Sequence, residues 1–140
     1  MKLEKQIVPP KKKKPENLQE SLCNFGNKVK VWDGKDLEAI GKTFKSVLKS
    51  SMSSFDKTND PSFLLCSIVL QTILSYILTR GMMSSVFKVK YKFPKENINQ
   101  FGDKIIELSQ TVNKTEFVPT LMVILAFAYK NDLLPSITTS

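Results

Sequence analysis

The spacing of apolar positions predicts a mainly helical protein. Apolar residues recur every three or four positions over 17–25, 35–51 and 97–112, which puts them on one face of a helix in each stretch. A shorter apolar run predicts a last helix from about 118 to about 131. Gly26 should end the first of these helices, and the polar residues 50–59 should form a loop before the next helix. Turn and capping residues thus separate the stretches, so we expect a small helical bundle.

The stretch at about 62–80 is apolar almost all round. Asp60 and Pro61 suit a helix start, and Arg80 followed by Gly81 suits an end. The apolar run is shorter than the roughly twenty residues needed to cross a bilayer, and Gln71 interrupts it. We therefore expect this helix to be the centre of the bundle, with a membrane-inserted helix as the less favoured alternative.

Two segments alternate lysine with apolar residues in the manner of strands. They lie at about 28–32 and 86–93, and the second has Lys88, Lys90 and Lys92 on one side. Paired, they would form a minor two-stranded ribbon with an apolar face against the helices and a lysine face outward. The same lysines could equally be solvated side chains that discourage edge pairing.

Charge is concentrated at the N-terminus. Residues 1–15 contain six lysines, one glutamate and three prolines, so most of the net charge of +8 lies there. This composition predicts an extended or disordered basic arm, because it offers little surface to bury. We expect a single helical domain over 16–135 and a polar tail over 136–140.

The basic residues predict an anionic partner. Arg80 is the only arginine, and lysine acts as a point charge rather than a reader of bases, so any nucleic-acid contact should be non-specific and directed at phosphates. A solubilising tail and a solvated helix face remain alternatives. The candidate contact residues are in the arm, on one face of the 35–51 helix and on the ribbon: Lys11, Lys12, Lys13, Lys14, Lys42, Lys45, Lys49, Lys88, Lys90 and Lys92.

The usual residues of catalysis and metal binding are missing or scattered. The chain has no histidine, which removes the commonest general base and metal ligand. Cys23 and Cys66 form no CxxC pair and are expected to be buried, although a disulfide between them stays open. No glycine-rich phosphate loop is present. We expect no enzyme activity, no metal site and no cofactor.

These patterns favour a structural or interaction protein of a larger assembly, such as a viral or phage nucleoprotein. Its arm would contact neighbouring subunits or nucleic acid, and the protein would be an oligomer or a member of a complex. One alternative is a stand-alone, non-specific nucleic-acid-binding protein, and a second is a small membrane-active protein. The N-terminus lacks a signal-peptide pattern, so we expect an intracellular or virion location.

Overall fold

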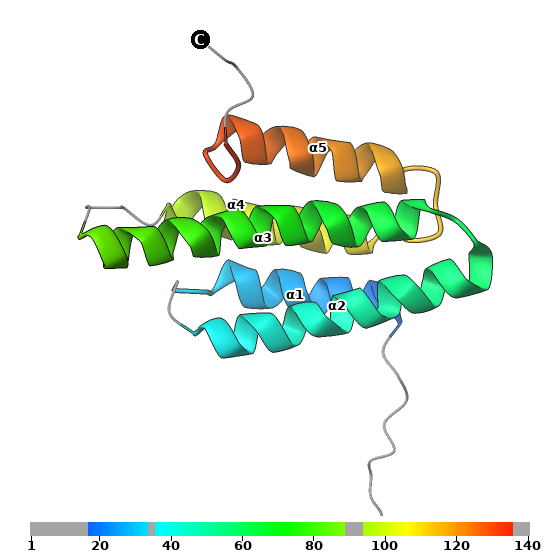
Figure 1. Cartoon of the computed structure of the whole chain (residues 1–140). Coiled ribbons are helices and arrows are strands. Elements are labelled where there is room, and N and C mark those ends of the chain that lie inside the picture. The colour runs from blue at the N-terminus through cyan, green and yellow to red at the C-terminus, as the bar shows by residue number, and fades with distance from the viewer. Residues whose placement is uncertain (1–16, 34–35, 89–93, 136–140) are drawn as a thin grey trace, which may run out of the picture.

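Five helices make up the described part of the chain. The computed structural model describes residues 17–33, 36–88 and 94–135, and in these it has no strand. The helices are α1 (Leu18–Lys30), α2 (Leu37–Thr58), α3 (Ser62–Phe87), α4 (Lys95–Ser109) and α5 (Phe117–Lys130) (Figure 1). The prediction of a mainly helical bundle is confirmed.

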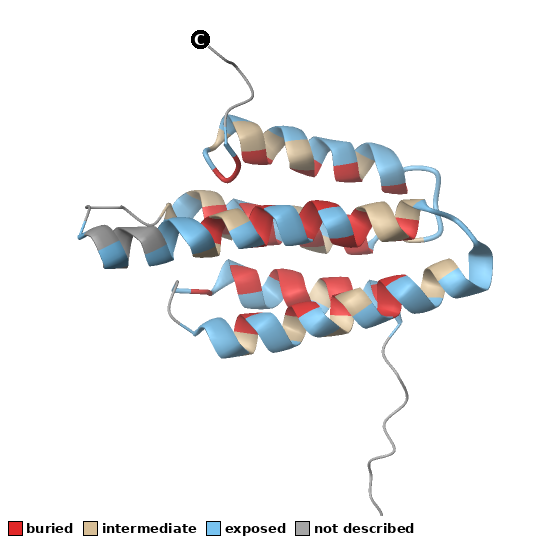
Figure 2. Cartoon of the chain, in the orientation of Figure 1, coloured by how far each residue is buried: buried red, intermediate tan, exposed pale blue. Residues whose placement is uncertain are grey.

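The helices form a closed ring in which each packs against two others. In the order α1, α2, α3, α5, α4 and back to α1, every neighbouring pair is in contact. In Figure 2 the buried positions of α5 lie on its side toward the other helices, and buried residues of all five helices belong to one core cluster. The expectation that the 62–80 helix lies at the centre is therefore not met: α3 is one member of the ring, and side chains from all five helices fill the middle.

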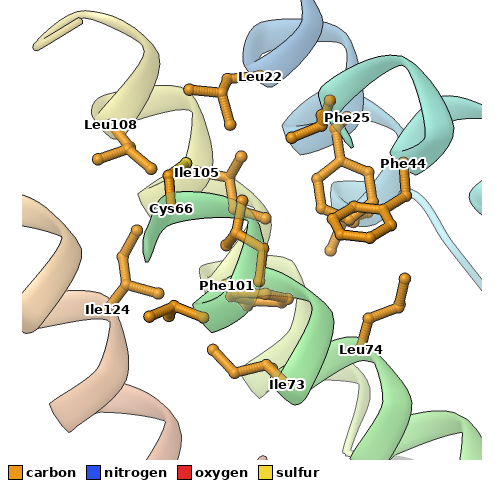
Figure 3. Close-up of a cluster of buried hydrophobic side chains, with 14 of the residues drawn as sticks. Leu22, Phe25, Phe44, Cys66, Ile73, Leu74, Phe101, Ile105, Leu108 and Ile124 are labelled. Atoms are coloured by element: carbon orange, nitrogen blue, oxygen red, sulfur yellow. The ribbon is translucent and has the colours of Figure 1, made fainter. Parts of the chain in front are cut away.

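Large apolar side chains from every helix make up the core (Figure 3). Phe25 of α1 is completely buried and its ring centroid lies 5.3 Å from that of Phe44 on α2. Phe63 of α3 packs against Phe117 of α5, with their ring centroids 5.6 Å apart. The second contact joins helices that are distant in sequence. In α1, α2 and α4, the buried apolar residues follow the helical spacing seen in the sequence.

α1 and α4 approach so closely that their crossing has no room for a side chain. A Cβ at Gly102 would lie 2.7 Å from the carbonyl oxygen of Gly26 and 2.7 Å from the backbone nitrogen of Lys30. Gly26 was expected to end the first helix, but α1 continues to Lys30. The residue is glycine because another backbone lies against it, not because the chain turns there.

The predicted ribbon is not seen among the described residues. Residues 28–30 are the last turn of α1, and residues 86 and 87 end α3, while 89–93 lie outside the described residues. Val29 is buried one turn after Phe25, which continues the helical spacing begun by Leu18 and Leu22. Four or five alternating residues are too few to distinguish a strand from the end of an amphipathic helix.

α3 begins where the sequence indicated and ends later. Asp60 Oδ1 accepts hydrogen bonds from the backbone nitrogen of Ser62 (3.0 Å) and from its hydroxyl (2.9 Å). The helix then passes through Gly81, where an added Cβ would meet nothing within 4 Å. Among the described helices, the segment Ser62–Met82 of α3 is the one long and apolar enough to span a membrane, and 44% of an apolar stretch of 18 residues within it is buried in the bundle.

The two cysteines are free and differ in exposure. Burial raises the pKa of the Cys66 thiol to about 12, because a thiolate there would lose its hydration. Cys23 is only partly buried.

We expect a thiol reagent at about pH 8 to modify Cys23 quickly in the native protein and Cys66 only after denaturation, because the thiolate is the reactive form. Mass spectrometry of the labelled protein measures this; rapid native labelling of Cys66 would contradict the core packing.

Candidate anion-binding surface

A polar groove runs between α1 and α2. Its lining residues are Asn24, Asn27 and Lys28 from α1, Val31 directly after α1, and Lys42, Thr43 and Ser46 from α2. Among the described residues, the lining of the groove includes two lysines and no aspartate or glutamate. A site of this composition attracts anions, because its described lining residues carry positive charge and no negative charge.

A buried hydrogen bond fixes the register of the two helices that form the groove. Ser50 Oγ and Ser21 Oγ are bonded at 2.9 Å inside the α1–α2 contact. α2 therefore continues through residues 50–58, which had been interpreted as a loop, because Ser50 and Ser51 are buried against its neighbours. It ends at Asn59, whose φ of 61° is left-handed.

The lysines of α2 share one exposed side of the helix. Lys42, Lys45 and Lys49 are spaced by three and four residues and are all exposed, on the side away from buried Ile40, Phe44 and Val47. Lys42 also lines the groove with Lys28. We call the group Lys28, Lys42, Lys45 and Lys49 the lysine surface.

Acidic residues limit the extent of this surface. Glu38 lies one turn before Lys42, and Asp56 lies two turns after Lys49. The span from Lys42 to Lys49 is about 10 Å at the helical rise of about 1.5 Å per residue. The surface is therefore the size of a few neighbouring phosphates rather than of a long basic track.

Two uncharged polar side chains of the groove donate hydrogen bonds within their own helices. Thr43 Oγ1 donates to the carbonyl of Ala39 at 2.7 Å, and the Asn27 amide donates to the carbonyl of Cys23 at 3.0 Å. Lys30 is drawn to the α4 side, where its Nζ lies 2.9 Å from Asp103 Oδ1. The ammonium groups of the lysine surface are thus its main charged donors.

The structure brings together only part of the predicted set of lysines. Lys42, Lys45 and Lys49 lie together, whereas Lys88 is exposed at the end of α3 with a φ of 57°. The remaining predicted residues, Lys90 and Lys92 on the ribbon and Lys11, Lys12, Lys13 and Lys14 in the arm, lie outside the described residues. Lys28 was missed, because its segment was interpreted as a strand; helical spacing places it one turn after Asn24, on the same stripe.

Two further hollows carry less distinct chemistry. One lies between α4 and α5 and is lined by Asp103, Lys104 and Glu107, with Lys104 Nζ 5.1 Å from the centroid of the Phe127 ring. The other lies by the α2–α3 turn and contains Asp60 and Lys114. Both mix charges of opposite sign, and among the described residues no cluster of three or more acidic or cysteine side chains is arranged to hold a metal ion.

No protein-family model, no curated protein and no solved structure matches this chain. The lysine surface therefore has to be interpreted from its own residues. Its exposed ammonium groups, the acid-free groove and the mobile lysine stems are suited to holding phosphate-like anions without reading a sequence.

Proposed function

We propose that this protein is a non-enzymatic interaction protein of a nucleoprotein assembly, in which the lysine surface contacts nucleic-acid phosphates. The observation that carries the proposal is that Lys28 and Lys42 both line a groove in which no described lining residue is acidic, and that Lys45 and Lys49 continue the row of exposed lysines along α2. Each lysine that neutralises a phosphate releases a counterion, which favours binding at low salt. Binding of this kind needs no catalytic group.

The N-terminal arm extends this proposal. Residues 1–15 carry a net charge of +5 by sequence, and they lead directly into α1, which forms one wall of the groove. The arm would add further phosphate contacts or reach a neighbouring subunit. A viral or phage particle is one setting for such a protein, and an intracellular nucleoprotein is another.

Charge removal from α2 tests the proposal. The triple variant Lys42→Gln, Lys45→Gln, Lys49→Gln should bind labelled single- and double-stranded DNA and RNA more weakly than the wild type. Its plot of log affinity against log salt concentration should be less steep by about 2 to 3, since each lost phosphate contact removes about 0.7 to 0.9 from the slope. Fluorescence anisotropy over a salt series measures both quantities.

A second triple variant supplies the control for net charge. Lys95→Gln, Lys114→Gln, Lys130→Gln removes the same charge from exposed positions on and beside α4 and α5. The slope of log affinity against log salt concentration for this control variant should be nearly the same as for the wild type. Equal losses in both triple variants would show that only net charge matters. Absence of wild-type binding at low salt would reject nucleic acid and leave an acidic protein partner to be sought.

A further inference from the structure

The groove between α1 and α2 has a recessed wall as well as a charged rim. Lys28 and Lys42 are exposed, whereas Thr43 and Ser46 on the α2 side are half-buried. The groove has a volume of about 620 Å³. Sites for small ligands usually measure about 300 to 1,000 Å³. A phosphate held by the lysines therefore leaves room in the groove for other groups of the same ligand.

The width of the groove limits the kind of nucleic acid that can enter it. α1 and α2 lie side by side and pack together (Figure 1), with a hydrogen bond of 2.9 Å between Ser50 and Ser21. The axes of packed helices are about 8 to 10 Å apart, so the space between their outer side chains admits one chain of nucleotides. The major groove of a duplex alone is about 12 Å wide, so a duplex would rest on the rim.

The walls offer hydrogen-bond acceptors, which a phosphate cannot use. The Asn27 amide nitrogen donates to the Cys23 carbonyl oxygen at 3.0 Å and to its sulfur at 3.7 Å, which leaves the Asn27 amide oxygen as an acceptor. The Thr43 hydroxyl donates its proton to the Ala39 carbonyl oxygen at 2.7 Å, so its oxygen can only accept. Such acceptors suit the N–H groups of a base, which are free in a single strand and paired in a duplex.

An exposed apolar side chain lies at the same groove. Val31 follows α1 directly, lines the groove and is 74% exposed. Each base has a flat face that gains by covering apolar surface, and in a duplex these faces are already stacked on one another. A base of a single strand can leave its stack and cover Val31. Contact of this kind does not depend on which base is present.

We infer that the α1–α2 groove binds one nucleotide unit of a single-stranded nucleic acid. Lys28 and Lys42 hold the phosphate. The unpaired edge of the base donates to the oxygens of Asn27 and Thr43, and one face of the base covers Val31. The inference rests on the proposed function, because it takes nucleic acid as the ligand and names the form that the lysine surface prefers. A duplex still contacts the exposed lysines, but it gains nothing from the recessed groups.

Filling the groove without removing charge tests the inference. The variant Ser46→Leu places a larger apolar side chain on the recessed wall and keeps every lysine. Its affinity for short oligo-dT and oligo-U should fall about five- to tenfold, because the base loses one or two hydrogen bonds. Its affinity for a DNA hairpin duplex should change by less than about twofold, since the rim is intact. Fluorescence anisotropy with full-length protein measures all three affinities.

The matched control is Ser53→Leu, at an exposed position of the same helix that does not line the groove. It should bind all three ligands as the wild type does. Val31→Ser gives a second test at an exposed position, where folding is not at risk, and should weaken single-strand binding about threefold. Circular dichroism checks that each variant is folded.

The outcomes separate this inference from the proposed function. Wild-type binding that Ser46→Leu and Val31→Ser leave unchanged, or weaken equally for single strands and duplex, overturns the inference and keeps phosphate binding by the lysine surface. Selective loss of oligo-dT or oligo-U binding supports the inference. Absence of wild-type binding to all three ligands rejects the proposed function and the inference together.

Discussion

Replacing Gly102 by alanine should destabilise the protein, whereas the same replacement at Gly41 should stabilise it. Both glycines lie inside helices, where alanine is favoured by about 1 kcal/mol. A Cβ at Gly41 meets nothing within 4 Å, but at Gly102 it lies 2.7 Å from backbone atoms of α1. Those atoms cannot move aside unless the two helices separate.

The magnitudes decide the sign of each effect. Overpacking costs about 1 to 3 kcal/mol, and contact with backbone on two sides puts Gly102→Ala at the upper end, which leaves a net loss of about 2 kcal/mol. Gly41→Ala should gain up to about 1 kcal/mol. Urea unfolding followed by circular dichroism measures both free energies. Equal effects of Gly102→Ala and Gly41→Ala would mean that α1 and α4 do not cross closely at Gly26 and Gly102.

Removing the Phe25 side chain should have the largest effect of any single truncation considered for this fold. Phe25 is completely buried and packs against Phe44 at a centroid distance of 5.3 Å. Phe25→Ala loses this contact and leaves a cavity, which costs about 3 to 5 kcal/mol. A domain of this size has a total stability of about 5 to 15 kcal/mol, so the variant should be partly unfolded at mild temperature.

Phe127→Ala is the matched control for this truncation. Phe127 is half-buried at the hollow between α4 and α5, with Lys104 Nζ 5.1 Å from its ring centroid. Its loss should cost about 1 kcal/mol, because less surface returns to water and little cavity forms. Thermal and urea unfolding of the two variants provide the comparison. A similar cost for both would show that Phe25 is not enclosed as described.

Regular spacing predicted the helices whose buried faces are continuous. Ile98, Phe101, Ile105 and Leu108 follow one another at three or four residues, and all are buried in α4. The start of α3 was also predictable, because the Asp60 cap and Pro61 act locally. Features of this kind depend on neighbours in sequence and need no knowledge of the tertiary structure.

The errors have tertiary causes. Gly26 resembles a helix end in sequence, but its role depends on Gly102, which is distant in the chain. Ser50 and Ser51 belong to a polar stretch, yet they are buried where α2 packs against its neighbours. The position of α3 in the ring was equally hidden, because a helix that is apolar almost all round does not mark in its sequence which side faces the core.

The candidate site was predictable in the same partial way. The spacing of Lys42, Lys45 and Lys49 placed them on one helix face, and the structure keeps them there. Lys28 and the acid-free groove could not be found without the packing of α1 against α2. The arm and ribbon lysines outside the described residues stay predictions.

Nuclear magnetic resonance of the full chain with a short oligonucleotide tests the central claim most directly. Titration of ¹⁵N-labelled protein at low salt should shift the amide signals of Asn24, Asn27, Lys28, Lys42 and Ser46, and leave α5 signals such as Val123 unchanged. Added salt should reverse the shifts, since the contacts are made to phosphates. Shifts confined to α4 and α5, or none at all, would contradict phosphate binding at the lysine surface.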